Sequence, residues 1–132
     1  MANNFYPIAF KITGVLNIVA ALAALVSMSS HLEMFYGDVH VDPALRFYHY
    51  CFWFIVLLFG VGYFFLASDP ERFYPIALIG GLAKLFIAAG WLHMFSGGAA
   101  KTPVVGGAVY DIVSGLILLA FFVTAKKKSP TS

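Results

Sequence analysis

Four long apolar runs dominate the chain, and polar or charged residues bound each of them. The runs cover residues 6–28, 47–67, 74–95 and 104–125. Each has the roughly 20 residues that a helix needs to cross a bilayer. None alternates with the period of two that marks a strand, and within lipid only helices and closed barrels satisfy every backbone hydrogen bond. The pattern predicts an all-α membrane protein, with residues 1–132 forming a single bundle of four transmembrane helices.

Prolines mark the starts of these runs. Pro7, Pro43, Pro75 and Pro103 each lie at or just before one of them. Proline suits the first helical turn, where its missing N–H would have no partner. Asp42 directly precedes Pro43 and is predicted to cap its helix.

Lysine and arginine positions predict the orientation, because cytoplasmic connections carry an excess of both. Residues 126–128 are all lysine, and Arg72 lies in the SDPER segment between the second and third runs. The opposite side has only Arg46 and Lys101. We therefore expect both termini and SDPER on the cytoplasmic side of the membrane.

Composition agrees with a protein whose main partner is the lipid bilayer. Only 11% of the residues are charged, whereas soluble domains have about a quarter. The net charge of +2 gives no argument for a nucleic-acid partner. Seven glycines are predicted to let helices pack closely: Gly60, Gly62, Gly80, Gly81, Gly106, Gly107 and Gly115. The many aromatic residues near the run ends, Trp53 and Trp91 among them, are predicted to form the interfacial belt.

Two short strings recur along the chain and indicate an internal repeat. FYPIA occurs at residues 5–9 and 73–77, and L-x-M-F-x-G at residues 32–37 and 92–97. The pattern predicts two parallel helical-hairpin repeats, 5–68 and 73–125, related by an axis along the membrane normal. Chance similarity between apolar helices is the alternative. A true repeat would extend the first helix about two turns beyond the bilayer, through MSSHLEMFYGD, because the two spacings differ by eight residues.

Lys84 lies near the middle of the third apolar run. A lysine at that depth costs about 2.5–3.5 kcal/mol on insertion scales, so it should face inward and have a partner. Asp111 in the fourth run is the obvious candidate. Lys84 lies about 16 Å in from Phe95 and Asp111 about 10 Å in from Val104, both measured from the outer side. The lysine stem can span the difference, and an ion pair is predicted.

Three further polar side chains could join this pair: Asn17, Tyr110 and Ser114. The group could be a buried polar knot that fixes the helix register. It could equally be a proton relay or a site for the polar head of a lipophilic ligand.

A second polar set lies on the outer side: His31, Glu33, Asp38, His40, His49 and His93. Histidine and carboxylate together can bind a divalent metal. If the first helix continues outward, His31 and Asp38 share a face. The spacing matches no established metal motif, and ordinary polar loop residues are the alternative.

The segment GVGYFFLASDPERFYPIALIGGLAKL, residues 60–85, resembles small bacterial four-helix membrane proteins of the DoxX-like group. The similar features are Gly60 and Gly62, the acidic-Pro-x-Arg turn, and Gly80 followed by Lys84. The resemblance covers about the middle third of the chain. It implies a compact bundle in a bacterial inner membrane, and some DoxX-type proteins are subunits or accessories of membrane redox systems. The sequence itself contains no redox cofactor motif.

Three functional classes follow. The first is an accessory or interaction subunit without catalysis of its own, with a protein partner or as a homo-oligomer. The second is a carrier or binding protein for a proton or a lipophilic small molecule, centred on Lys84 and Asp111. The third is a metal- or redox-linked enzyme accessory that uses the outer histidines and acids. The absence of any phosphate loop or catalytic triad favours the first.

Overall fold

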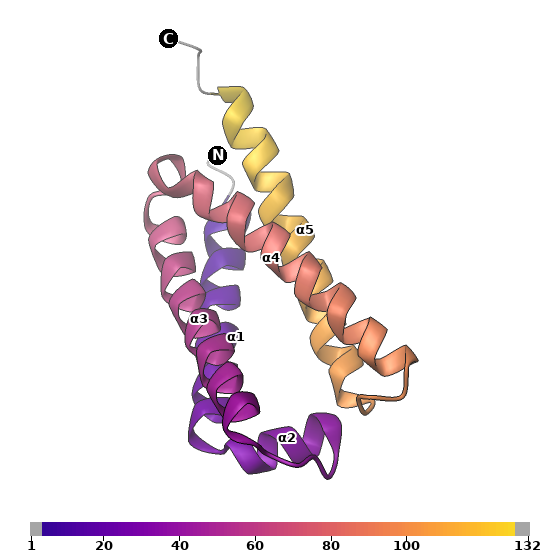
Figure 1. Ribbon diagram of the computed structural model, residues 1–132. Helices are drawn as coiled ribbons and strands as arrows, with labels where there is room; N and C mark the ends of the chain where they lie inside the picture. The colour runs from indigo at the N-terminus through magenta and orange to yellow at the C-terminus, as the bar shows by residue number, and fades with distance from the viewer. Residues whose placement is uncertain (1–3, 129–132) are drawn as a thin grey trace.

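The computed structural model describes residues 4–128, which form five α-helices (Figure 1). They are α1 (Phe5–Val26), α2 (Met28–Tyr36), α3 (Pro43–Ser68), α4 (Pro70–Ser96) and α5 (Pro103–Lys128). All except the short α2 are long and apolar enough to cross a membrane. The predicted all-α architecture with four membrane-spanning helices is confirmed, and the chain is an integral membrane protein.

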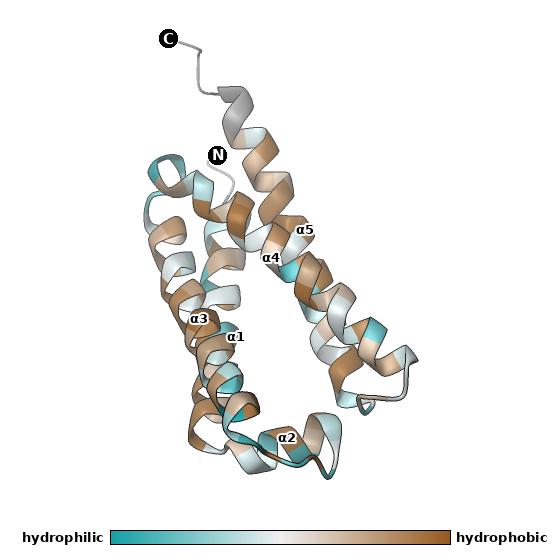
Figure 2. Ribbon diagram, viewed as in Figure 1, coloured by the Kyte–Doolittle hydropathy of each residue, from teal (hydrophilic) through white to brown (hydrophobic). Residues whose placement is uncertain are grey.

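The four long helices pair into two antiparallel hairpins. The closest packing joins α1 to α3 and α4 to α5. Figure 1 shows the start of α1, the end of α5 and the α3–α4 turn at one end of the bundle, here called the termini end. α2 and the loop at residues 97–102 lie at the other, here called the α2 end. Figure 2 shows apolar residues along the long helices and polar ones around α2 and the α3–α4 turn. The hairpins are as predicted, whereas their origin as a repeat stays a prediction.

Aspartate caps and prolines set where α3 and α4 begin. Asp42 Oδ1 accepts a hydrogen bond from the Leu45 N–H at 2.7 Å, which confirms the predicted cap. The prediction that the third helix begins near residue 74 is wrong. Asp69 caps α4, which begins at Pro70. A cap followed by proline is a complete start signal, and Pro75 inside α4 removes only one backbone bond close to that start.

The prediction that the first helix protrudes through residues 28–38 is also wrong. Ser27, with φ −125° and ψ 57°, interrupts the helix. α2 then turns across the end of the bundle (Figure 1) and ends at Tyr36, and the next residue, Gly37, has φ +83°. The Lys101 N–H donates to the Phe35 carbonyl at 2.7 Å, and Lys101 Nζ donates to the Glu33 carbonyl at 3.1 Å. These bonds satisfy carbonyls at the C-terminal end of α2 and dock the helix on the α4–α5 loop.

Paired glycines bring the helices of each hairpin together. A Cβ at Gly60 would lie 3.1 Å from the carbonyl oxygen of Gly14, which joins α3 to α1. A Cβ at Gly81 would lie 3.1 Å from the carbonyl oxygen of Gly115, which joins α4 to α5. Such close backbone approach is typical of membrane helix pairs. Gly106 does not take part, because nothing lies within 4 Å of a Cβ there.

The two hairpins meet at the termini end. Phe10, Tyr63, Leu66, Ala77 and Leu118, which come from all four long helices, form a buried cluster there. This apolar cluster joins the two hairpins at the termini end. Toward the α2 end they separate, and the space between them holds the candidate site.

Candidate functional site

A buried ion pair joins α4 to α5. Lys84 Nζ lies 2.6 Å from Asp111 Oδ1, and the two side chains are only 6% and 10% exposed. Gly81 and Gly115 cross within one helical turn of these residues. The close approach of the backbones therefore places the two charged groups within reach of each other. The ion pair predicted from the similar depths of Lys84 and Asp111 in their helices is present.

Asn17 extends the pair to α1. Its Oδ1 accepts a hydrogen bond from Lys84 Nζ at 3.2 Å. The Tyr110 hydroxyl lies 3.0 Å from the same oxygen and 3.2 Å from the Thr13 carbonyl oxygen. Lys84 Nζ also lies 4.3 Å from the centre of the Tyr110 ring, a distance at which a cation is attracted to the ring face. The network ties α1, α4 and α5 together.

Ser114 meets this network only at Tyr110, with whose side chain it forms a hydrogen bond. Its hydroxyl donates to the Tyr110 carbonyl of its own helix at 2.7 Å. Tyr63 belongs to the buried cluster and also lines the cavity described below. The predicted polar group therefore consists of Lys84, Asp111, Asn17 and Tyr110, here called the polar corner.

The polar corner keeps hydrogen-bonding capacity. Two of the three Lys84 N–H groups go to Asp111 and Asn17. Among the described side chains, those of residues 4–125, no donor is placed on the second carboxylate oxygen of Asp111. Because a buried carboxylate is stable only when its charge is compensated, Lys84 neutralises Asp111 while leaving this oxygen available to another donor.

A cavity of about 500 Å³ lies beside the polar corner, between the hairpins. All four residues of the corner line it. The rest of the wall is almost wholly apolar and aromatic, and includes Phe52, Trp53, Phe59, Ile87 and Trp91. Small-molecule sites have this size and this combination of apolar walls with a few convergent polar groups.

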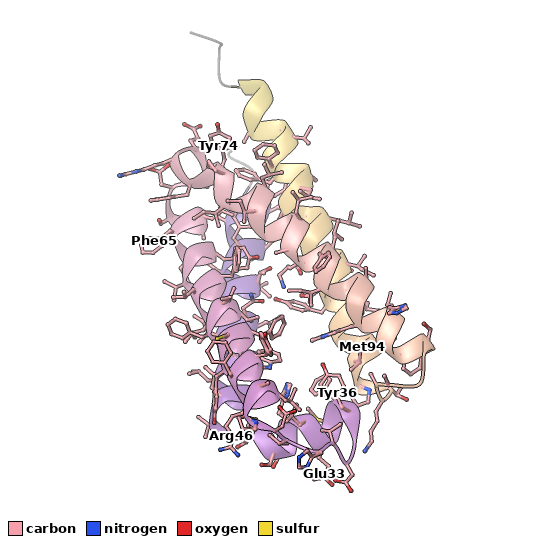
Figure 3. All side chains as sticks on the ribbon, in the orientation of Figure 1. Glu33, Tyr36, Arg46, Phe65, Tyr74 and Met94 are labelled. Atoms are coloured by element: carbon pink, nitrogen blue, oxygen red, sulfur yellow. The ribbon has the colours of Figure 1, made fainter. Side chains whose placement is uncertain are left out.

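The cavity opens between α3 and α4. Ile55 on α3 and Phe86 on α4 both line it, and they are 52% and 81% exposed. The buried cluster closes the termini end, and α2 lies across the other. Figure 3 shows Tyr36, at the end of α2, on the side of the bundle formed by α4 and α5. Because Ile55 and Phe86 are exposed on helices that span the membrane, the opening faces lipid.

Two histidines meet at the α2 end of the cavity. The ring centres of His31 on α2 and His49 on α3 are 5.4 Å apart. His49 Nε2 lies 3.0 Å from the Ala24 carbonyl oxygen. The His31 ring stacks on Phe35 and meets the Trp53 ring edge-on. Burial, and then the neighbouring His49, lower the pKa of His31 from 6.5 to about 4, so its imidazole is neutral near pH 7.

The other candidate metal ligands stay apart. Glu33, Asp38, His40 and His93 are exposed. Asp38 follows the end of α2, so it does not share a helical face with His31 as expected. Across the described part of the chain, no three His, Cys, Asp or Glu side chains are placed to hold a metal ion.

Two residues assigned to the interfacial belt belong to the cavity instead. Trp53 is 6% exposed, and both Trp53 and Trp91 line the wall. The Trp91 ring occupies the space that a Cβ at Gly107 would need. A glycine facing a tryptophan on the neighbouring helix is the signal that could have indicated this packing from sequence.

No protein family, curated protein or solved structure matches this chain. The DoxX-like resemblance stays a prediction, and the chemistry of the site rests on its geometry.

Proposed function

We propose that this protein binds a lipophilic small molecule that carries a hydrogen-bonding head group. One observation supports this above the others: an apolar cavity of about 500 Å³ opens toward lipid and has a buried ion pair in its wall. No feature of comparable weight supports the accessory-subunit class or the metal-linked class, and both stay predictions.

The polar corner suits a neutral head group such as a hydroxyl or an amide. The free Asp111 oxygen accepts from such a donor, and the Lys84 ammonium stands beside it. Hydrogen bonds to charged groups contribute about 1.5–3 kcal/mol, more than those between neutral groups. The surrounding apolar wall excludes water, which strengthens them further.

The mouth between α3 and α4 suits entry from the bilayer. A lipophilic molecule already dissolved in the membrane meets Ile55 and Phe86 without crossing water. Its apolar body then packs on Trp53, Phe59 and Trp91. The lipid bilayer is thus both the surroundings of the protein and the source of its ligand.

A polar knot alone accounts for the site less well. A knot that only fixes register needs closely packed helices around it, because unfilled space forfeits dispersion contacts. The ion pair lies instead at the edge of a large cavity, with one carboxylate oxygen unused. The space and the free acceptor both suit an occupant.

Filling the cavity tests the proposal. Ala83 lines the cavity, whereas Ala89 is exposed on the same helix and does not. Wild type, Ala83→Phe and Ala89→Phe would be purified in mild detergent, and their organic extracts compared by mass spectrometry. We expect one lipophilic compound near stoichiometry in wild type and Ala89→Phe. In Ala83→Phe the amount of this compound should fall at least roughly tenfold, because a phenylalanine ring in the cavity should lower the affinity for the ligand by more than that factor.

The control is size-exclusion chromatography, in which all three proteins should elute as the same folded species. Identical extracts from all three, containing only bulk membrane lipid, would contradict the proposed function.

A further inference from the structure

The Tyr63 hydroxyl adds a polar group to the cavity wall. Tyr63 lies on α3 and lines the cavity. The hydrogen bonds of the polar corner join its residues to one another and to Thr13, and none of them includes this hydroxyl. The other side-chain hydrogen bonds of residues 4–125 do not include it either. Within the described part of the chain, the Tyr63 hydroxyl therefore has no hydrogen-bond partner.

This hydroxyl is the accessible part of an otherwise buried ring. Tyr63 is only 1% exposed and packs in the buried cluster with Phe10 and Leu66. Among the described side chains, the one unbonded polar atom that a water molecule cannot reach is Nδ1 of His31. The Tyr63 hydroxyl is unbonded and is not such an atom, so a molecule in the cavity can touch it.

Gly80 on α4 places the hydroxyl beside the polar corner. A Cβ at Gly80 would lie 2.5 Å from the Tyr63 hydroxyl oxygen, so the hydroxyl rests directly on the glycine. Gly80 and Lys84 are four residues apart and share a face of α4, about 6 Å apart along the helix axis. Asp111 is also close enough to act electrostatically on the hydroxyl. The hydroxyl therefore lies about one helical turn from the ion pair, on its termini-end side.

The two free groups have opposite hydrogen-bonding roles. An ionised carboxylate such as that of Asp111 can only accept, whereas a phenol O–H can donate. A ligand that bonds to both groups must therefore donate to Asp111 and accept from Tyr63. A hydroxyl does both with a single oxygen. An ether lacks the donor, and an ammonium lacks the acceptor.

We propose that Tyr63 is a ligand-binding residue and that the head group of the ligand both donates and accepts, of which an alcohol is the smallest. The inference rests on the proposed function and narrows its ligand class. The head group lies between Asp111 and Tyr63, and the apolar body extends toward Trp53 and Trp91 at the α2 end.

Three saturated probes with the same apolar body test this class. The first is bicyclohexyl with one hydroxyl at its far end, the second is the methyl ether of that alcohol, and the third is bicyclohexyl itself. None absorbs in the near ultraviolet, so the two tryptophans of the chain, Trp53 and Trp91, report occupancy by their fluorescence. With probe concentrations in the micelle measured by equilibrium dialysis, wild type should bind the alcohol about tenfold more tightly than the ether, because only the alcohol donates to the Asp111 carboxylate.

Tyr63→Phe locates the second contact, because it keeps the ring in the buried cluster and removes only the hydroxyl. The affinities for the alcohol and the ether should each fall about fivefold, the value of one hydrogen bond, while the affinity for bicyclohexyl stays unchanged. The free variant should unfold at the wild-type temperature, because the lost hydroxyl has no partner there. Tyr48→Phe is the matched control: Tyr48 lies on the same helix, is 68% exposed and does not line the cavity, so all three affinities should stay unchanged.

The outcomes separate the two claims. Three results would each overturn the proposed head group and leave the proposed function standing: an alcohol affinity that survives in Tyr63→Phe, an equal loss for bicyclohexyl in that variant, or equal binding of alcohol and ether by wild type. No saturable binding of any of the three probes to folded wild type overturns the proposed function itself.

Discussion

The Lys84–Asp111 pair shows how one buried contact can serve both the fold and a site. Each charge is costly in the membrane interior unless the other compensates it. Asn17 and the Tyr110 ring complete the surroundings of the ammonium. Because the pair is neutral overall and fixed by three helices, it can hold a polar surface at the edge of an apolar cavity.

Replacing one residue of the Lys84–Asp111 pair should lower the free energy of unfolding far more than replacing both. We expect Lys84→Met and Asp111→Leu each to lower the free energy of unfolding by about 3–5 kcal/mol, because each leaves an uncompensated buried charge. The double variant should recover most of that loss. Denaturant unfolding in detergent, analysed as a double-mutant cycle, measures the coupling. Lys11→Met, an exposed lysine on α1, is the control and should change little. Losses that simply add would show that the pair is not coupled.

The pair could be predicted from sequence because Lys84 and Asp111 are the only opposite charges at matching depth in neighbouring helices. Asn17 and Tyr110 follow from the same depth argument. Ser114 reaches the pair only through Tyr110, because its short side chain bonds the Tyr110 carbonyl four residues back on its own helix. Depth along a helix places a residue, but not the direction in which its side chain bonds.

At the scale of elements, apolar runs predict that helices exist better than they predict where helices end. The break at Ser27 lets α2 dock against Lys101, which lies 68 residues beyond its partner Glu33 in the chain. The start of α4 depends on the Asp69 cap. The cavity was not predicted either, because it arises from the separation of the hairpins and not from any one helix.

Glycine placement determines how closely the helices of a hairpin pack. α4 has one glycine at the close crossing, Gly81, and one away from any neighbour, Gly90, which serves as the control. A Cβ at Gly81 would lie 2.7 Å from Leu119 Cγ and 3.1 Å from the Gly115 carbonyl oxygen, whereas nothing lies within 4 Å of one at Gly90. We expect Gly81→Ala to destabilise the protein by about 1–3 kcal/mol through overpacking. Gly90→Ala should be neutral or stabilise it by up to about 1 kcal/mol through helix propensity. Thermal unfolding in detergent compares them, and equal effects would argue against the close α4–α5 crossing.

At the scale of the whole molecule, the fold separates a closed half from an open half. The termini end is held by a buried cluster from all four long helices. At the α2 end, α2 and its bonds to Lys101 link the hairpins across the cavity. The side of the membrane that α2 faces therefore decides which aqueous compartment lies next to the His31 end of the cavity.

The distribution of lysine and arginine predicts that α2 faces away from the cytoplasm. In a Cys51→Ala background, which removes the single cysteine, Ser30→Cys places a thiol on α2 and Ser68→Cys places one beside the α3–α4 turn. Both serines are exposed and lie at opposite ends of the bundle. A membrane-impermeant maleimide added to intact cells should label Ser30→Cys and spare Ser68→Cys, and permeabilised cells should label both. The reverse labelling pattern would show that the protein has the opposite orientation in the membrane. The His31 end of the cavity would then lie next to the cytoplasm, while the mouth between α3 and α4 would still open to lipid.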